Sequence, residues 1–191
     1  IASVVINGNA GVGVAENMMS GFVHVRGDAS QSAGATAHGG LLVIDGNAGA
    51  RCGISMKGVD IVVKGSIGHM SAFMAQAGTL TVLGDAGEAL GDSLYEARLY
   101  VRGSVKSLGA DCIEKEMRDE HLRELADKLA AAGLVLGGLA LVVAVVEGEG
   151  EVALRQRLAQ GLDALGVLGG LGDEAGVFVA DFFEDGHGDA I

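Results

Sequence analysis

Apolar and polar residues alternate in six short stretches along the first half of the chain, and each stretch leads into a glycine. Each of these marker glycines is preceded by four residues in the order apolar, any, apolar, any. The glycines are spaced 19 residues apart, at Gly8, Gly27, Gly46, Gly65, Gly84 and Gly103. A two-residue alternation is typical of a β-strand with one buried face. A fixed short period that recurs six times predicts a solenoid, in which each coil stacks on its neighbours.

The remaining positions of the repeat predict the course of each coil. The expected strands carry the apolar pairs Val4/Ile6, Val23/Val25, Leu42/Ile44, Ile61/Val63, Leu80/Val82 and Leu99/Val101. Each marker glycine is followed by Asn, Asp or Ser, which predicts a sharp bend whose backbone tolerates a positive φ. Ten places after the marker, an apolar ladder predicts a second strand: Met18, Ala37, Met56, Ala75 and Leu94. Gly58 stands one place earlier than its counterparts, which predicts a bulge in the fourth copy.

The predicted fold class is all-β: a right-handed parallel β-helix of about six 19-residue coils. A left-handed hexapeptide helix would have 18-residue coils with six-residue sub-repeats, and this chain has no such sub-period. Further glycines recur inside the coils: Gly49, Gly53, Gly68, Gly87 and Gly91. A phosphate-binding loop occurs once, between a strand and a helix, whereas these glycines return in every coil. We therefore interpret them as structural residues that let adjacent coils approach closely.

The repeat fades after Gly103, and a helix is expected from about Asp119 to Ala132. Asp119 is the expected N-cap and Gly133 the C-terminal stop, while Leu122, Leu125 and Leu129 form one apolar stripe. Because an open solenoid end needs cover, we interpret this helix as a cap or as a docking element for a partner. The predicted domains are a β-helix over 1–112, a helical cap over 113–133 and a tail over 134–191.

The tail differs in composition from the rest of the chain. Residues 134–191 contain no Ser, Thr, Asn, Lys, Pro, Met, Cys or Tyr, although these types are common in ordinary sequences. Our hypothesis is that part of this tail was assigned provisionally rather than read from a gene, which an intact-mass measurement would test. Its apolar stretch from Leu134 to Val146 is too short to span a bilayer. We give the tail no functional weight.

Composition and charge narrow the class of protein. An apolar fraction of 49% argues against disorder, and a net charge of −12 argues against a nucleic-acid partner. The sequence begins at Ile1 rather than Met, which we interpret as processing or trimming. Cys52 and Cys112 form neither a disulfide framework nor a metal-ligand spacing, so a reduced cytoplasmic protein is expected.

Few residues suggest catalysis. His69 could act as a general acid or base, but no carboxylate or nucleophile is spaced to complete a site with it. Cys112 has no nearby histidine, His121 is expected to face solvent, and the carboxylates lack metal-ligand spacing. His38, Lys57 and Tyr95 share one position of the coil and predict a row along an outer edge. The expected partner-facing residues are Lys57, His69, Gln76, Asp92, Tyr95 and Glu96.

Several segments of this chain resemble the C-terminal G-x-G-x-G domain of glutamate synthase. The resemblance is carried by Gly49–Gly58, Gly68–Gly78 and Gly87–Ala97, and it continues through Gly109–Met117 and Asp119–His121. The later segments are most similar to the stand-alone form of the domain, a separate subunit of glutamate synthase-like and N-methylglutamate synthase complexes. The resemblance covers about residues 4–133.

The resemblance implies a non-catalytic scaffold. In the family, the β-helix packs between a glutamine-amidotransferase-type part and an FMN-binding synthase barrel, and it holds them together for transfer of ammonia or amine. This chain lacks the N-terminal catalytic cysteine of the amidotransferase. It also lacks the cysteine cluster that binds the iron–sulfur centre of the synthase. The resemblance therefore implies that FMN and the iron–sulfur cluster are on partner subunits.

Two alternatives stay open from the sequence. The β-helix subunit of formylmethanofuran dehydrogenase belongs to a rival family with the same fold, so the chain could instead be part of a formyl-transfer complex. An independent β-helix enzyme would have its site around His69, Asp92 and Tyr95.

Overall fold

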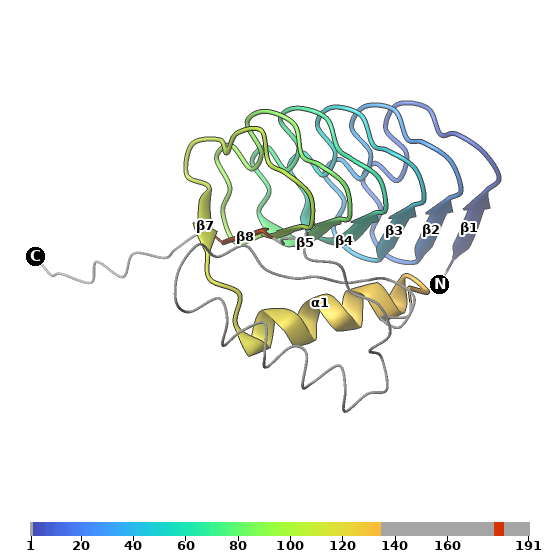
Figure 1. Cartoon of the computed structure of the whole chain (residues 1–191). Coiled ribbons are helices and arrows are strands. Elements are labelled where there is room, and N and C mark those ends of the chain that lie inside the picture. The colour runs from blue at the N-terminus through green and yellow to red at the C-terminus, as the bar shows by residue number, and fades with distance from the viewer. Residues whose placement is uncertain (1, 135–177, 182–191) are drawn as a thin grey trace, which may run out of the picture.

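A computed structural model describes residues 2–134 and 178–181, and it is a parallel β-solenoid followed by one helix (Figure 1). One strand of each coil contributes to a continuous sheet: β1 (Ser3–Ile6), β2 (Phe22–Val25), β3 (Leu41–Ile44), β4 (Lys57–Val63), β5 (Ala77–Val82) and β6 (Arg98–Val101). Each strand pairs in parallel with the next, as Val4 with Val23 and Leu42 with Ile61. The predicted parallel β-helix is confirmed, and its right-handed sense stays a prediction.

The corner after each strand depends on close approach of neighbouring coils. A Cβ built on Gly46 would lie 2.3 Å from Asp28 Oδ1 and 2.9 Å from the Gly27 backbone. The same crowding recurs at Gly27, Gly65, Gly84 and Gly103. None of these five glycines has a positive φ, so contact between coils, and not backbone conformation, excludes a side chain there.

Positive φ occurs instead in the second half of each coil, where we expected a second strand. In the third coil, Arg51, Gly53 and Ser55 have φ of 59°, 70° and 52°. Alternating left-handed residues make this part a series of tight turns, closed by bonds such as Ile54 N to Arg51 O at 3.1 Å. The strand prediction is wrong here, although the apolar ladder does face inward, since Ala37, Met56 and Ala75 are buried.

The predicted bulge is present in the fourth strand. Lys57 pairs with Ala77, whereas Asp60 pairs with Thr79, so one extra residue is accommodated between them in β4. The expectation from the early Gly58 is therefore confirmed.

Two apolar clusters hold the molecule together. The larger fills the inside of the coils with residues such as Leu42, Ile61 and Leu80, all fully buried. The smaller lies on the outer face of the sheet, where Val62 and Tyr100 pack with Leu125 and Leu129 of α1 (Asp119–Ala131). Helix α1 runs along this face, across the strands (Figure 1).

The start of α1 differs from the prediction. Its N-cap is Arg118, not Asp119, and the Arg118 amide donates to His121 Nδ1 at 3.2 Å. His121 is buried, so the expectation that it faces solvent is wrong. The stripe of Leu122, Leu125 and Leu129 does face the sheet, with Leu122 partly buried. The helix is confirmed, but it packs on the outer face of the sheet rather than over the open end of the coils, since its stripe contacts Val62 and Tyr100. The domain boundaries stay predictions.

The last coil is followed by an antiparallel addition to the sheet. Strand β8 (Phe178–Asp181) pairs antiparallel with both β6 and β7 (Ile113–Lys115), which gives the order β1-β2-β3-β4-β5-β6-β8-β7. The rest of the predicted tail, over 135–177 and 182–191, lies outside the described residues. No helix in the described part of the chain is long and apolar enough to span a membrane.

Candidate functional site

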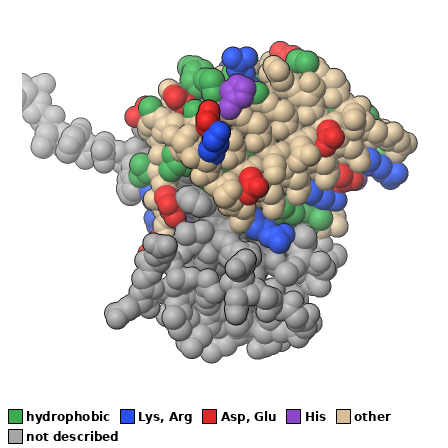
Figure 2. Space-filling view, turned by 45° about the horizontal axis from the view of Figure 1, so that its top comes forward, with side chains coloured by type: hydrophobic (Ala, Val, Ile, Leu, Met, Phe, Trp, Pro, Cys, Tyr) green, Lys and Arg blue, Asp and Glu red, His purple; other side chains and the backbone are tan. Residues whose placement is uncertain are grey.

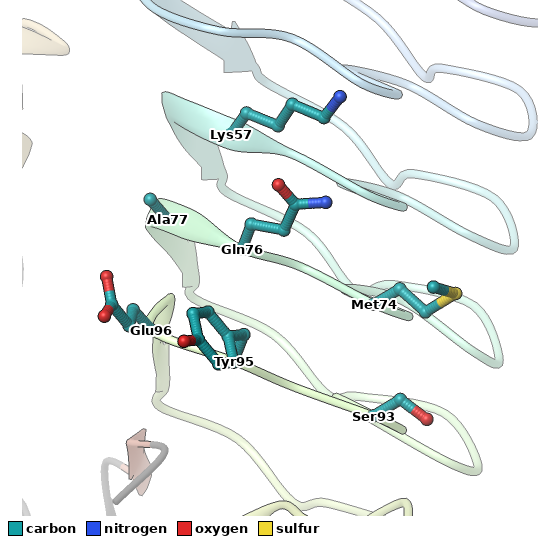
Figure 3. A pocket seen from close by; sticks show the side chains of 7 residues that line it. All are labelled: Lys57, Met74, Gln76, Ala77, Ser93, Tyr95 and Glu96. Atoms are coloured by element: carbon teal, nitrogen blue, oxygen red, sulfur yellow. The ribbon is translucent and has the colours of Figure 1, made fainter. Parts of the chain in front are cut away.

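A shallow groove of about 540 Å³ crosses the outer edge of the third, fourth and fifth coils. We call it the outer groove; it is lined by Lys57, Met74, Gln76, Ala77, Ser93, Tyr95 and Glu96. Figure 3 shows the side chains of Lys57, Gln76 and Tyr95 on successive coils, with Glu96 beside Tyr95. Four of the six predicted partner-facing residues therefore lie together.

The 19-residue period places the groove residues in a row. Lys57, Gln76 and Tyr95 each stand eleven residues after a marker glycine, directly after a buried residue of the inner ladder. The amides of this row donate to the preceding coil, as Gln76 N to Met56 O at 2.8 Å and Tyr95 N to Ala75 O at 2.9 Å. A fixed backbone thus presents one outward side chain on each coil.

The groove combines exposed apolar surface with opposite charges. Met74 and Tyr95 are each about half exposed. Lys57 lies on the third coil and Glu96 on the fifth, so the backbones that carry these opposite charges are two coils apart, or about 9.5 Å at the usual spacing of strands. Aromatic and methionine side chains are enriched at protein interfaces, and a charged pair fixes the direction of a partner.

His69 and Asp92 do not line the outer groove. Glu88 forms an ion pair with Lys106 at 2.7 Å, which lowers the pKa of Glu88, and the charge of His69 lowers it further. Asp92 Oδ1 accepts a hydrogen bond from Ser93 Oγ at 3.0 Å. Of the three residues of the alternative catalytic site, only Tyr95 lies in the groove.

The two thiols are unsuited to nucleophilic catalysis. Burial raises the pKa of Cys52 to about 12 and that of Cys112 to about 11, so both stay protonated at neutral pH. Within residues 2–134 and 178–181, no group of three His, Cys, Asp or Glu side chains could hold a metal ion.

The sequence interpretation missed a polar ladder along the corners. Asn9 Oδ1 accepts from Asp28 N at 2.9 Å, Asp28 Oδ1 from Asn47 N at 2.7 Å, and Asn47 Oδ1 from Ser66 N at 2.9 Å. The small polar residue after each marker glycine, interpreted above only as a bend signal, thus binds one coil to the next. Its recurrence at one coil position is the signal that could have revealed the ladder.

A charged row on the sheet was also missed. Asp45 Oδ1 lies 2.6 Å from Lys64 Nζ and 2.9 Å from His24 Nε2, which joins β2, β3 and the end of β4. Partial burial acts to raise the pKa of Asp45, but the hydrogen bonds from Lys64 and His24 outweigh it and leave the pKa below its ordinary value.

In Figure 2, charged side chains on the visible face of the coils are scattered rather than gathered into a basic patch.

The chain matches no family model, and no solved structure matches it. A segment of 27 residues is 74% identical to part of Protein GlxC of Rhizobium meliloti (strain 1021). This match covers 14% of the chain and 12% of that protein, so it spans a small part of either. It is consistent with a glutamate synthase-like protein.

Proposed function

We propose that this chain is a non-catalytic scaffold subunit of a glutamate synthase-like complex of the N-methylglutamate synthase (methylamine–glutamate N-methyltransferase) type. The observation that carries the proposal is the outer groove, in which a rigid row of exposed side chains repeats coil by coil. The motifs that resemble the G-x-G-x-G domain and the 27-residue identity with Protein GlxC support the same assignment.

The scaffold couples an amidotransferase-like subunit to an FMN-binding synthase subunit. FMN and the iron–sulfur cluster belong to these partners, and the complex works in the cytoplasm. The two buried thiols, whose pKa values are raised by burial, support a chain without a cysteine nucleophile, as expected for a non-catalytic subunit. His69 and Asp92 are proposed as further contacts outside the groove.

Purification of the native complex through a tag on this chain tests the assignment. Peptide mass spectrometry should identify an amidotransferase-like chain and a synthase chain, and the complex should show the absorbance of bound flavin. The isolated chain should show no amine or ammonia transfer. Turnover by the isolated chain would overturn the proposal, and partners with a pterin-type cofactor would favour a formyl-transfer complex instead.

Reversal of charge in the outer groove tests where the partner docks. The double variant Lys57→Glu/Glu96→Lys keeps the net charge, and we expect at least about tenfold weaker association, since like charges then face the partner. The matched control is Lys106→Glu/Glu88→Lys, an exposed ion pair outside the groove. Both variants should keep the melting temperature of the parent, and equal association of the two variants would exclude the groove as the docking surface.

A further inference from the structure

Three exposed side chains follow one another along the outer groove in the order positive, neutral, negative. Lys57 lies on the third coil, Gln76 on the fourth and Glu96 on the fifth, and all three are exposed. Lys57 and Gln76 stand at the same coil position, and Glu96 stands one residue beyond it. The amide of Gln76 is therefore flanked by opposite charges one coil away on either side (Figure 3).

Neither of these two charges has a counter-ion in the part of the chain that the structure describes. Lys64, Lys106 and Lys128 each lie within 2.8 Å of a carboxylate oxygen. In the same part of the chain, Lys57 and Glu96 form no ion pair. Both charges are thus available to opposite charges on another molecule, beside the half-exposed apolar side chains of the groove.

We infer that, without partner subunits, this chain forms a two-fold symmetric dimer in which the outer groove of one copy faces that of a second copy. A two-fold interface brings the same patch of both copies together, so each contact occurs twice. With the axis across the row at Gln76 and the two stacks antiparallel, Lys57 of one copy stands at the level of Glu96 of the other. The order positive, neutral, negative is therefore complementary to itself.

The other groove residues fit the same arrangement. At the centre two Gln76 side chains meet, and each amide can donate to and accept from the other. On either side, the Tyr95 ring stands at the level of Lys57 of the second copy, which favours a cation–π contact beside the ion pair. A two-fold dimer with parallel stacks would place Lys57 against Lys57 and Glu96 against Glu96. The charges therefore select the antiparallel form.

The dimer goes beyond the proposed function, since it concerns the chain without its partners. The groove has seven lining residues, fewer than the roughly 20–30 residues a side of a standard interface. We therefore expect a weak, reversible dimer, with a dissociation constant on the order of 100 µM. A partner subunit that docks in the same groove has to displace the second copy, and a weak dimer permits this.

Sedimentation equilibrium of the full chain tests the pairing with Lys57→Glu and Glu96→Lys. Each single variant places like charges at both ends of the contact, and we expect at least about tenfold weaker self-association. An equimolar mixture of the two variants should associate about as well as the parent, because each charge of one variant then faces its opposite on the other. The double variant Lys57→Glu/Glu96→Lys should also dimerise like the parent, although we expect it to lose the partner subunits.

Lys106→Glu is the matched control, because it changes the net charge by the same two units at an exposed site outside the groove. Its self-association should stay close to that of the parent. A parent that is monomeric up to about 1 mM, or a mixture that associates no better than the single variants, overturns the inference. The measurement uses no partner subunit, so failure of the dimer is distinguished from failure of the proposed complex.

Discussion

Arg51 shows how the coil uses left-handed residues other than glycine. Its φ is 59°, a conformation that costs an L-residue about 1–2 kcal/mol relative to glycine, and its side chain is exposed. We expect Arg51→Gly to be neutral or to raise the free energy of unfolding by up to about 1 kcal/mol, because relief of strain offsets the greater entropy of an unfolded glycine. Urea denaturation measures the change.

Arg26→Gly is the control for that substitution. Arg26 is exposed as well but has no positive φ, so the same change should destabilise by about 0.5–1 kcal/mol. Equal effects at the two positions would show that backbone strain at Arg51 is not significant.

The ion pairs of Asp45 predict a pH dependence. Because the pKa of Asp45 is lower in the folded chain than in the unfolded chain, its contribution to stability is present above the ordinary pKa of 3.8 and is lost as the pH falls through the folded value. We expect Asp45→Asn to reduce the free energy of unfolding at pH 7, and the difference from the parent to shrink as the pH falls below about 4. Denaturation of both proteins at several pH values measures the difference, and a gap that persists at pH 3 contradicts the assignment.

At the scale of elements, α1 is held by its apolar stripe and by ion pairs to the sheet. Leu125 and Leu129 are buried, Lys128 Nζ lies 2.8 Å from Asp60 Oδ2, and Glu124 accepts hydrogen bonds from Arg98 and Tyr100. We expect Leu125→Ala to cost about 2–4 kcal/mol by leaving a cavity under the helix. Hydrogen exchange should accelerate in α1 and much less in β2 and β3.

Asp127→Ala is the matched control on the same helix, because Asp127 is exposed. It should change stability by less than about 0.5 kcal/mol. If the two variants accelerate exchange in α1 equally, the apolar stripe is not what docks the helix.

The strands were predictable and the turns were not, for a physical reason. Alternation around residues such as Leu42 and Ile44 reports burial directly, so the period placed strands β1 to β6 and their register. The left-handed turns fall on Arg51, Met70 and Ala89, which carry no conformational signal in the sequence. The polarity of His121 predicts a solvent-facing side chain, whereas its hydrogen bond to the Arg118 amide lets it be buried.

The candidate site was predictable in part. Lys57, Gln76 and Tyr95 share one coil position, so the period alone brings them together. His69 and Asp92 stand four and eight residues after their marker glycines, whereas Tyr95 stands eleven after its own. A solenoid places different coil positions in different columns, which explains why these three do not form one site.

At the scale of the whole molecule, each coil is stabilised mainly by its two neighbours, so stability should vary along the stack. The first coil has one described neighbour and exposed valines, whereas the third and fourth coils are buried on both sides by adjacent coils. We expect amide protection to rise from β1 to β4. The first coil buries less apolar surface than the fourth, so its local opening costs less free energy.

Hydrogen exchange with mass spectrometry on the isolated chain measures this gradient. Peptides that cover β1 should exchange at least about tenfold faster than peptides that cover β4, which corresponds to about 1.4 kcal/mol in opening free energy. Equal protection of β1 and β4 would mean that the chain opens only as a whole.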